Sequence, residues 1–263
     1  MPLIVAKVFA PYEMPAGALP VRCHVLITEQ AQALEDYLVE TLPECYTTKL
    51  HLRQRATETN LSISELLMNK FPDPGNVMSG DFGEIVTLFF LSSERKERTT
   101  LIKKWRYKQD RTKAIPFSDV IILHREAANP SARDFVICAE SKQKATRSNT
   151  YIPIAKAIEG FEADKTGRLA RTLTWLREKA IDQGQQREIN FLERFTVDPT
   201  TEYLKYFKAV AIVDRALLNE EITRQINLPQ QDTSFEVIVL GIDNLKNLYE
   251  AVYSRACTEV TIE

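Results

Sequence analysis

The apolar and polar positions in the first part of the chain predict a short strand followed by helices. Residues 21–28 form a β-rich run, and residues 30–40 carry apolar side chains at helical spacing. A second short helix is expected to begin near Ser62. The sequence FPDPG at residues 71–75 is strong turn chemistry, so it is the predicted boundary of an N-terminal α+β lobe formed by residues 1–75.

The remaining residues, 76–263, predict a domain in which strands and helices surround one sheet. Two apolar runs, 117–123 and 134–139, are joined by a turn-rich connector and are expected to pair as antiparallel strands. The other expected elements are a helix from Ser79 or Asp81, helices near 154–164, 168–183 and 187–195, and buried strands at 206–213 and 235–240, each followed by a helical segment. This order predicts an α/β fold with a mixed central sheet flanked by helices.

Composition narrows the class of protein. The chain is 44% hydrophobic and 27% charged, as globular proteins are. No window reaches the roughly 18 consecutive apolar residues that a membrane span requires, and no charged leader precedes the first apolar run, so we expect a cytoplasmic protein without membrane contact. The four cysteines contain no CxxC pair, which favours reduced thiols over a zinc site or a disulfide framework. The three histidines are scattered, and no phosphate-binding glycine loop is present.

The net charge of −2 hides an uneven distribution. Between residues 95 and 147 there are fourteen Lys and Arg against six Asp and Glu, whereas the rest of the chain is acidic. Basic residues interleaved with Trp105 and Tyr107 suit a nucleic-acid backbone, because neutralising phosphates releases condensed counterions. The predicted DNA-binding residues are Lys103, Lys104, Arg106, Lys108, Arg111, Lys113, Lys144 and Arg147. The alternative interpretation is a solvated surface whose charges face water.

Three acids and a lysine form the predicted catalytic set. Asp119 opens one apolar run, and Glu140 and Lys142 end the next. Alternation along a strand places Glu140 and Lys142 on one face, and pairing of the two strands brings Asp119 beside Glu140. Neighbouring carboxylates repel unless a cation lies between them, and all-oxygen ligation favours Mg²⁺, with Mn²⁺ as the alternative. Glu84, on the preceding helix, supplies a further ligand.

The predicted chemistry is phosphodiester hydrolysis. A metal held by Glu84, Asp119 and Glu140 would polarise the scissile phosphate and lower the pKa of a bound water. Lys142 would orient or help to deprotonate that water, or stabilise the charge that develops on the phosphate. The competing interpretation is a structural salt bridge between Glu140 and Lys142, because short ExK motifs also occur by chance.

The order of these residues resembles the PD-(D/E)xK nuclease superfamily, although Ser118 precedes Asp119 and Pro116 lies two positions earlier. GDFGEI at 80–85, FSD at 117–119 and AESKQ at 139–143 are similar to the HamA family, the small effector subunits of Hachiman antiphage defence systems. This resemblance implies a restriction-endonuclease-like core and a DNA nuclease. It also implies a HamB-like helicase partner that restrains the nuclease until foreign or damaged DNA engages the helicase. The function left open beside it is a catalytically silent nucleic-acid-binding or regulatory subunit on the same fold.

Overall fold

A seven-stranded sheet forms the centre of the computed structural model, which describes residues 3–196 and 201–259. The strand order is β1-β2-β7-β6-β5-β4-β3. The strands are β1 (Phe9–Pro11), β2 (Arg22–Leu26), β3 (Thr100–Leu101), β4 (Val120–His124), β5 (Phe135–Lys144), β6 (Leu204–Asp214) and β7 (Phe235–Ile242). Strands β2, β7, β6 and β5 are parallel to their neighbours in that series, whereas β1, β4 and β3 pair antiparallel. The predicted α/β fold with a mixed central sheet is therefore confirmed.

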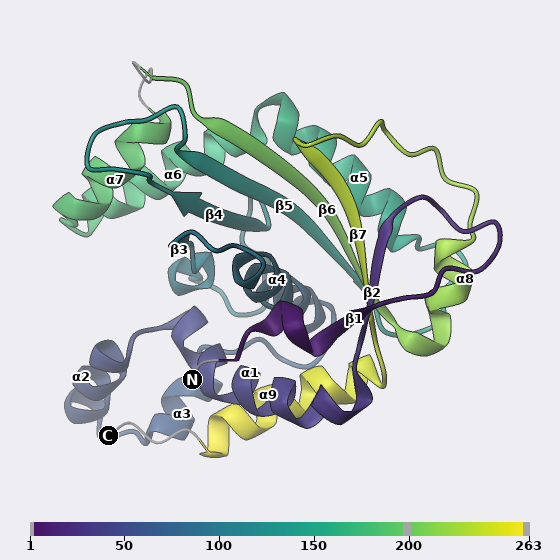
Figure 1. Ribbon diagram of the computed structural model, residues 1–263. Coiled ribbons are helices and arrows are strands. Elements are labelled where there is room, and N and C mark those ends of the chain that lie inside the picture. Colours follow the sequence, from purple (N-terminus) through teal and green to yellow (C-terminus); the bar gives the residue numbers. More distant parts are fainter. Residues whose placement is uncertain (1–2, 197–200, 260–263) are drawn as a thin grey trace.

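Helices cover both faces of this sheet (Figure 1). One buried cluster joins a sheet face to α1, α4 and α9, and a second joins the opposite face to α5, α6 and α7. The helices are α1 (Ala31–Tyr46), α2 (Lys49–Thr59), α3 (Ile63–Met68), α4 (Asn76–Ser93), α5 (Pro153–Ala163), α6 (Leu169–Asp182), α7 (Gln186–Thr196), α8 (Leu218–Ile222) and α9 (Leu245–Glu259). Short 3₁₀ segments are η1 (Val5–Val8), η2 (Thr28–Gln30), η3 (Lys104–Tyr107) and η5 (Arg215–Leu217), and the π-helical η4 (Asp164–Arg168) joins α5 to α6.

Local sequence explains where the N-terminal helices begin. Ser62 and Glu65 form a reciprocal capping box that starts α3, close to the predicted position. Helix α4 begins at Asn76, just after Gly75, whose φ of 142° lies in a region that side chains other than glycine rarely adopt. Helix α2 was not predicted, because only Leu52 of its eleven residues is buried and it lacks an apolar stripe. No described helix, including the apolar α4, has the length and hydropathy needed to cross a membrane.

The two strands expected to pair as antiparallel neighbours do so. In β4 and β5, Val120 lies opposite Ala139 and His124 opposite Phe135. Strand β5 continues to Lys144, beyond the apolar run at 134–139, because it pairs in parallel with β6 along its whole length. The apolar pattern stops earlier than the strand does, since the residues after Ala139 carry the polar site.

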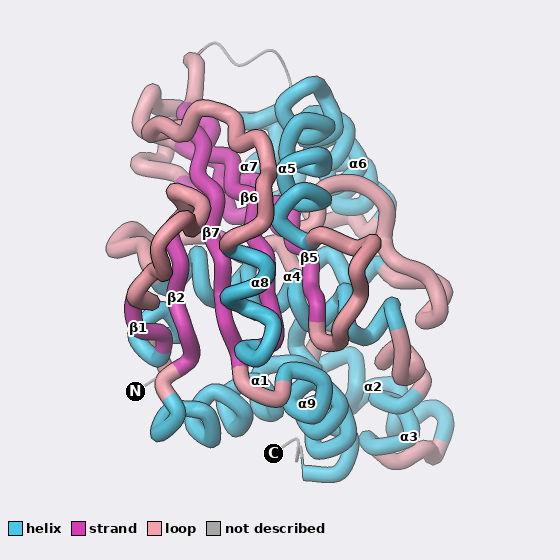
Figure 2. The backbone as a smooth tube through the Cα atoms, turned by 90° about the vertical axis from the view of Figure 1, so that its right-hand side faces the viewer, coloured by secondary structure: helices cyan, strands magenta, loops and turns pink. Residues whose placement is uncertain are grey.

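The segment predicted as an N-terminal lobe belongs to the same sheet and core as the rest. Strand β2 pairs in parallel with β7, with Arg22 opposite Ile238. Helix α1 lies beside α9 at one end of the molecule (Figure 2), and a single buried cluster extends from Val5 to Ala256. The turn at 71–75 therefore connects α3 to α4 within one packed body. Residues 1–75 have no separate hydrophobic core among the described residues.

Candidate active site

The four predicted catalytic residues lie together beside β4 and β5. Asp119 immediately precedes β4, Glu140 and Lys142 project from one face of β5, and Glu84 comes from α4. The Lys142 Nζ lies 3.2 Å from Asp119 Oδ2 and forms an ion pair with Glu140. The backbone N–H of Ser141 also donates to Asp119 Oδ2, at 3.0 Å. Strand pairing thus places an acid from each strand around one ammonium group.

Lys104, predicted to contact DNA, lies inside this site. Its Nζ is 3.2 Å from Glu84 Oε2 and 3.8 Å from Asp119 Oδ1, and it donates to the Ser118 carbonyl at 3.0 Å. The Trp105 indole N–H donates to the same Glu84 oxygen at 3.1 Å. Only 4% of Lys104 is exposed. Segment η3 therefore brings a cation of the chain itself between two of the predicted metal ligands.

Arg168 is a further site residue, whose contact with Glu140 the sequence did not reveal. Its guanidinium forms an ion pair with Glu140, donates to the Gly160 carbonyl at 2.7 Å and bonds Asp164 at 2.7 Å. The Asp164–Arg168 spacing of four residues is a visible helical ion-pair signal, but the partner on β5 is 28 positions away. The side chains of Lys142 and Arg168 are 29% and 20% exposed, so the site opens to solvent on their side.

Gly160 on α5 makes the space that Glu140 occupies. A Cβ added at residue 160 would lie 2.1 Å from the Glu140 Cδ. Glu140 has little freedom to move away, because one of its carboxylate oxygens pairs with Lys142 and the other with Arg168. A glycine is needed here for the close approach of α5 to β5, and its φ is an ordinary one.

The protonation states of the site follow from burial and from these ion pairs. Burial raises the pKa of Glu84 well above its usual value and, with the nearby charge of Asp119, raises that of Glu140 to about 7. Burial also opposes ionisation of Asp119, but Lys104 and Lys142 outweigh it and lower its pKa. Burial disfavours the charge on Lys142, yet Asp119 and Glu140 raise its pKa. Asp119 and Lys142 therefore both carry their charges at neutral pH.

The donor set suits a hard cation, although the carboxylates are not arranged around one. Glu84, Asp119 and Glu140 offer only oxygen ligands, which Mg²⁺ and Mn²⁺ prefer. Lys104 shows that a positive charge is accommodated between Glu84 and Asp119. Throughout residues 3–196 and 201–259, however, no three His, Cys, Asp or Glu side chains are grouped as ligands of a single ion. The ammonium and guanidinium groups stand among the carboxylates, so a metal would have to displace at least one of them.

Comparison with known proteins decides the family. A family model described as HamA matches residues 15–256, which include the whole candidate site. The chain belongs to the HamA family. Membership of HamA makes it a component of Hachiman antiphage defence. A search of curated proteins found no match.

In this HamA-family chain, the predicted basic stripe does not form one exposed surface. Lys104, Lys108 and Lys144 point inward, where they pair with Glu84, Asp81 and Glu221 respectively. The side chains of the three lysines are at most 5% exposed. A charge removed from water to this extent is stable only beside an opposite charge. These three lysines therefore belong to buried ion pairs and are not placed to contact a phosphate backbone.

The other five residues of the stripe lie nearer the surface. Lys103, Arg111, Lys113 and Arg147 form ion pairs with Glu44, Asp73, Asp110 and Glu220, and Arg106 donates to the Glu44 carbonyl. DNA contact by these five residues stays a prediction. Exposed ion pairs of this kind contribute little to stability, so nucleic acid could replace the acidic partners at low cost.

The raised pKa of Glu140 predicts how stability depends on pH in the metal-free chain. The pKa of Glu140 is about 7 in the folded chain, compared with an ordinary value of 4.5. Between these two pH values, Glu140 is therefore protonated in the folded state and ionised in the unfolded state. The contribution of Glu140 to stability is therefore expected to fall as pH rises from 4.5 to 7, and Glu140→Gln should remove this contribution from the pH dependence. Urea unfolding at several pH values in EDTA measures this, and identical slopes for both proteins would contradict it.

Proposed function

We propose that the chain is a metal-dependent DNA nuclease, the effector of its Hachiman system, controlled by a helicase partner. The observation that carries the proposal is the convergence of Asp119, Glu140 and Lys142 from two paired strands, with Glu84 supplied by α4. A structural salt bridge alone would explain Glu140 and Lys142. It would not explain why Glu84, Asp119 and a second buried lysine gather at the same place.

Each residue has a role that its environment supports. Glu84, Asp119 and Glu140 would hold the ion, which when bound supplies Lewis-acid activation of the scissile phosphate and of a water. Asp119 is suited to be the permanent ligand, because its pKa is lowered and the Ser141 N–H fixes one of its oxygens. Lys142 keeps its proton, so it would stabilise negative charge on the phosphate and would not act as the base.

Control by a partner is supported by the charge balance inside the site. Lys104, Lys142 and Arg168 already lie within ion-pair distance of the three carboxyl groups. A protein that must spare host DNA gains from such a restrained state. The sequence contains no nucleotide-binding glycine loop, so the ATP-driven helicase would be another chain. The same ion pairs favour the second candidate, a catalytically silent nucleic-acid-binding or regulatory subunit.

Plasmid degradation tests the proposal. The purified chain, alone and with its co-purified helicase and ATP, is incubated with plasmid in Mg²⁺ or in EDTA, and wild type is compared with Glu140→Ala/Lys142→Ala. We expect metal-dependent cutting that falls at least a thousandfold, about 4 kcal/mol of transition-state stabilisation, in the double variant.

A matched control is the exposed pair Lys156→Ala/Glu159→Ala on α5, which removes one acid and one lysine away from the carboxylates. It should cut as the wild type does. Absence of cutting by wild type in both formats would favour the silent subunit. Cutting that survives the Glu140→Ala/Lys142→Ala change would show that these residues are not the catalytic site.

A further inference from the structure

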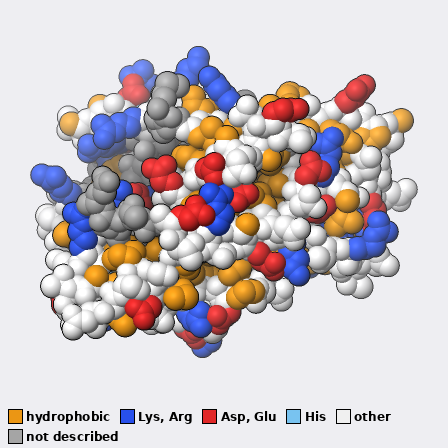
Figure 3. All heavy atoms as spheres, turned by 90° about the horizontal axis from the view of Figure 1, so that it is seen from below, with side chains coloured by type: hydrophobic (Ala, Val, Ile, Leu, Met, Phe, Trp, Pro, Cys, Tyr) orange, Lys and Arg blue, Asp and Glu red, His pale blue; other side chains and the backbone are white. Residues whose placement is uncertain are grey.

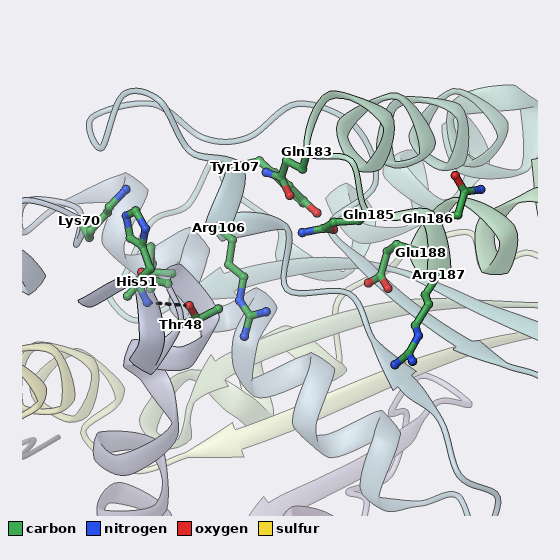
Figure 4. A pocket seen from close by; sticks show the side chains of 12 residues that line it. Thr48, His51, Lys70, Arg106, Tyr107, Gln183, Gln185, Gln186, Arg187 and Glu188 are labelled. Atoms are coloured by element: carbon green, nitrogen blue, oxygen red, sulfur yellow. Dashed lines mark hydrogen bonds between the residues drawn. The ribbon is translucent and has the colours of Figure 1, made fainter. Parts of the chain in front are cut away.

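A second concave surface lies near the N-terminal helices and the α6–α7 connection. One hollow of about 740 Å³ is bordered by α1, α2 and η3 on one side and by the start of α7 on the other (Figure 4). A second hollow of about 670 Å³ adjoins it, since Arg187 and Glu188 line both. The two together are named the basic groove here, defined by His51, Lys70, Arg98, Arg106, Arg125 and Arg187.

The basic groove has a strong excess of positive charge. Lys70, Arg98, Arg125 and Arg187 line it, and none of them forms an ion pair within residues 3–196 or 201–259. Glu188 is the one acidic residue among the described residues that line the two hollows. Like charges gathered in a concavity repel one another, so this arrangement costs stability unless an anion fills it.

Several other surface cations among the described residues are neutralised by acidic partners. Arg255, for example, pairs with Glu35, Asp36 and Glu259. On the face seen in Figure 3, acidic and basic side chains are interspersed among apolar ones. The chain as a whole carries a net charge of −2, so the unpaired cations of the groove do not reflect a generally basic protein.

The remaining lining of the groove suits the bases of a nucleic acid. Tyr107 and Phe191 offer aromatic rings, on which bases stack whatever their sequence. Gln183, Gln185 and Gln186 add amide groups that donate and accept hydrogen bonds, and Figure 4 shows their side chains around the hollow. An acidic peptide would satisfy the arginines, but it would lack the flat bases that stack on the two aromatic rings.

Segment η3 lies between the basic groove and the carboxylate site. Its first half, Lys104 and Trp105, bonds Glu84, whereas its second half, Arg106 and Tyr107, lines the groove. We propose that the basic groove binds the phosphodiester backbone of a nucleic acid and guides it past η3. This inference rests on the proposed nuclease function and deepens it, because it places the substrate in a groove whose described lining includes Arg106 alone of the residues predicted to bind DNA.

Fluorescence anisotropy tests the groove without cleavage. The full chain in EDTA, at roughly 50 mM salt, is titrated against a labelled single-stranded oligonucleotide and the corresponding duplex. Arg187→Glu is the informative variant, because Arg187 lines both hollows and lies in the first turn of α7, where an acidic side chain is compatible with the helix. Lys246→Glu on α9 is the matched control with the same change in net charge.

We expect Arg187→Glu to weaken binding of at least one probe about tenfold or more. The dependence of the binding constant on salt concentration should decrease by about the amount that one phosphate contact contributes. Lys246→Glu should bind as the wild type does. The probe, single-stranded or duplex, that shows the larger loss of affinity identifies the form of DNA that the groove binds. Equal binding by Arg187→Glu and wild type would overturn the inference, as would a wild type that binds neither probe, which would leave an acidic protein as the occupant.

The same assay separates this inference from the proposed function. Lys156→Ala/Glu159→Ala, outside both the groove and the carboxylate site, should bind DNA as the wild type does. A wild type that binds through Arg187 without ever cutting plasmid would refute the nuclease and keep the groove. A wild type that cuts plasmid but binds equally well after Arg187→Glu would refute the groove and keep the nuclease.

Discussion

Lys104→Met should bind Mn²⁺ or Mg²⁺ at least tenfold more tightly than the wild type, although its metal-free form is less stable. The Lys104 ammonium is within ion-pair distance of Glu84 and Asp119, so it competes electrostatically with any divalent ion there. Methionine keeps much of the length of the side chain and removes the charge. A tenfold gain in affinity corresponds to about 1.4 kcal/mol, a modest part of the interaction that is lost.

The cost to the metal-free protein has the same origin. Removing one member of a buried ion pair leaves an uncompensated charge and costs about 3 kcal/mol. Protonation of Glu84, whose pKa burial already raises, would relieve part of this cost. The melting temperature of Lys104→Met should therefore fall in EDTA and rise on adding metal by more than that of the wild type does, through mass action.

Binding of Mn²⁺, followed by electron paramagnetic resonance or calorimetry, and melting with and without metal provide the measurements. Lys103→Met is the matched control, because the neighbouring lysine pairs with the exposed Glu44 outside the carboxylate cluster. A Lys104→Met protein that binds Mn²⁺ more weakly than wild type would show that Lys104 supports the metal site and does not compete for it.

Gly160→Ala is expected to disrupt the site from the helix that faces it. The added Cβ would lie 2.1 Å from the Glu140 Cδ, well inside the contact distance of two carbon atoms. Either α5 must shift or Glu140 must abandon its ion pairs with Lys142 and Arg168. Overpacking of this kind costs about 1–3 kcal/mol, and a displacement of about 1 Å at a catalytic group lowers activity roughly a hundredfold.

Urea unfolding and plasmid cleavage measure the two effects. Gly80→Ala, on α4, is the matched control, because nothing lies within 4 Å of the position where its Cβ would be. That change should leave cleavage intact and stabilise the helix by up to about 1 kcal/mol. If Gly160→Ala were as stable and as active as the wild type, the tight packing of α5 against Glu140 would have no role in the site.

The chain's own cations hold the acidic groups of the site. Lys104 belongs to η3, whose other residues line the basic groove, and Arg168 belongs to the π-helical turn η4. Both are short connecting segments, which reposition more readily than the helix that carries Glu84 and the strand that carries Glu140. Two of the three neutralising cations therefore lie on short connecting segments, whereas the third, Lys142, lies on β5 itself.

The sequence by itself determined the features that depend on local periodicity. Alternation and β-branched runs located β4 and β5, and the turn-rich connector between them indicated antiparallel pairing. Pairing in that register brings Asp119 to the Ser141–Lys142 segment, so the central part of the site follows from residues within one hairpin. The helices that follow show the same agreement, because an apolar stripe specifies which face is buried whatever packs against it.

Only the tertiary structure decided which charges face inward. A lysine in a basic run has the same local pattern whether it meets water or a carboxylate, so Lys104 and Lys144 were indistinguishable from exposed residues until α4 and α8 supplied Glu84 and Glu221. Pairing of β2 with β7, more than 200 residues apart, likewise joined the expected lobe to the sheet. Periodicity predicts that one face of a helix or strand is buried. Which segment packs against that face depends on contacts between parts of the chain that are distant in sequence.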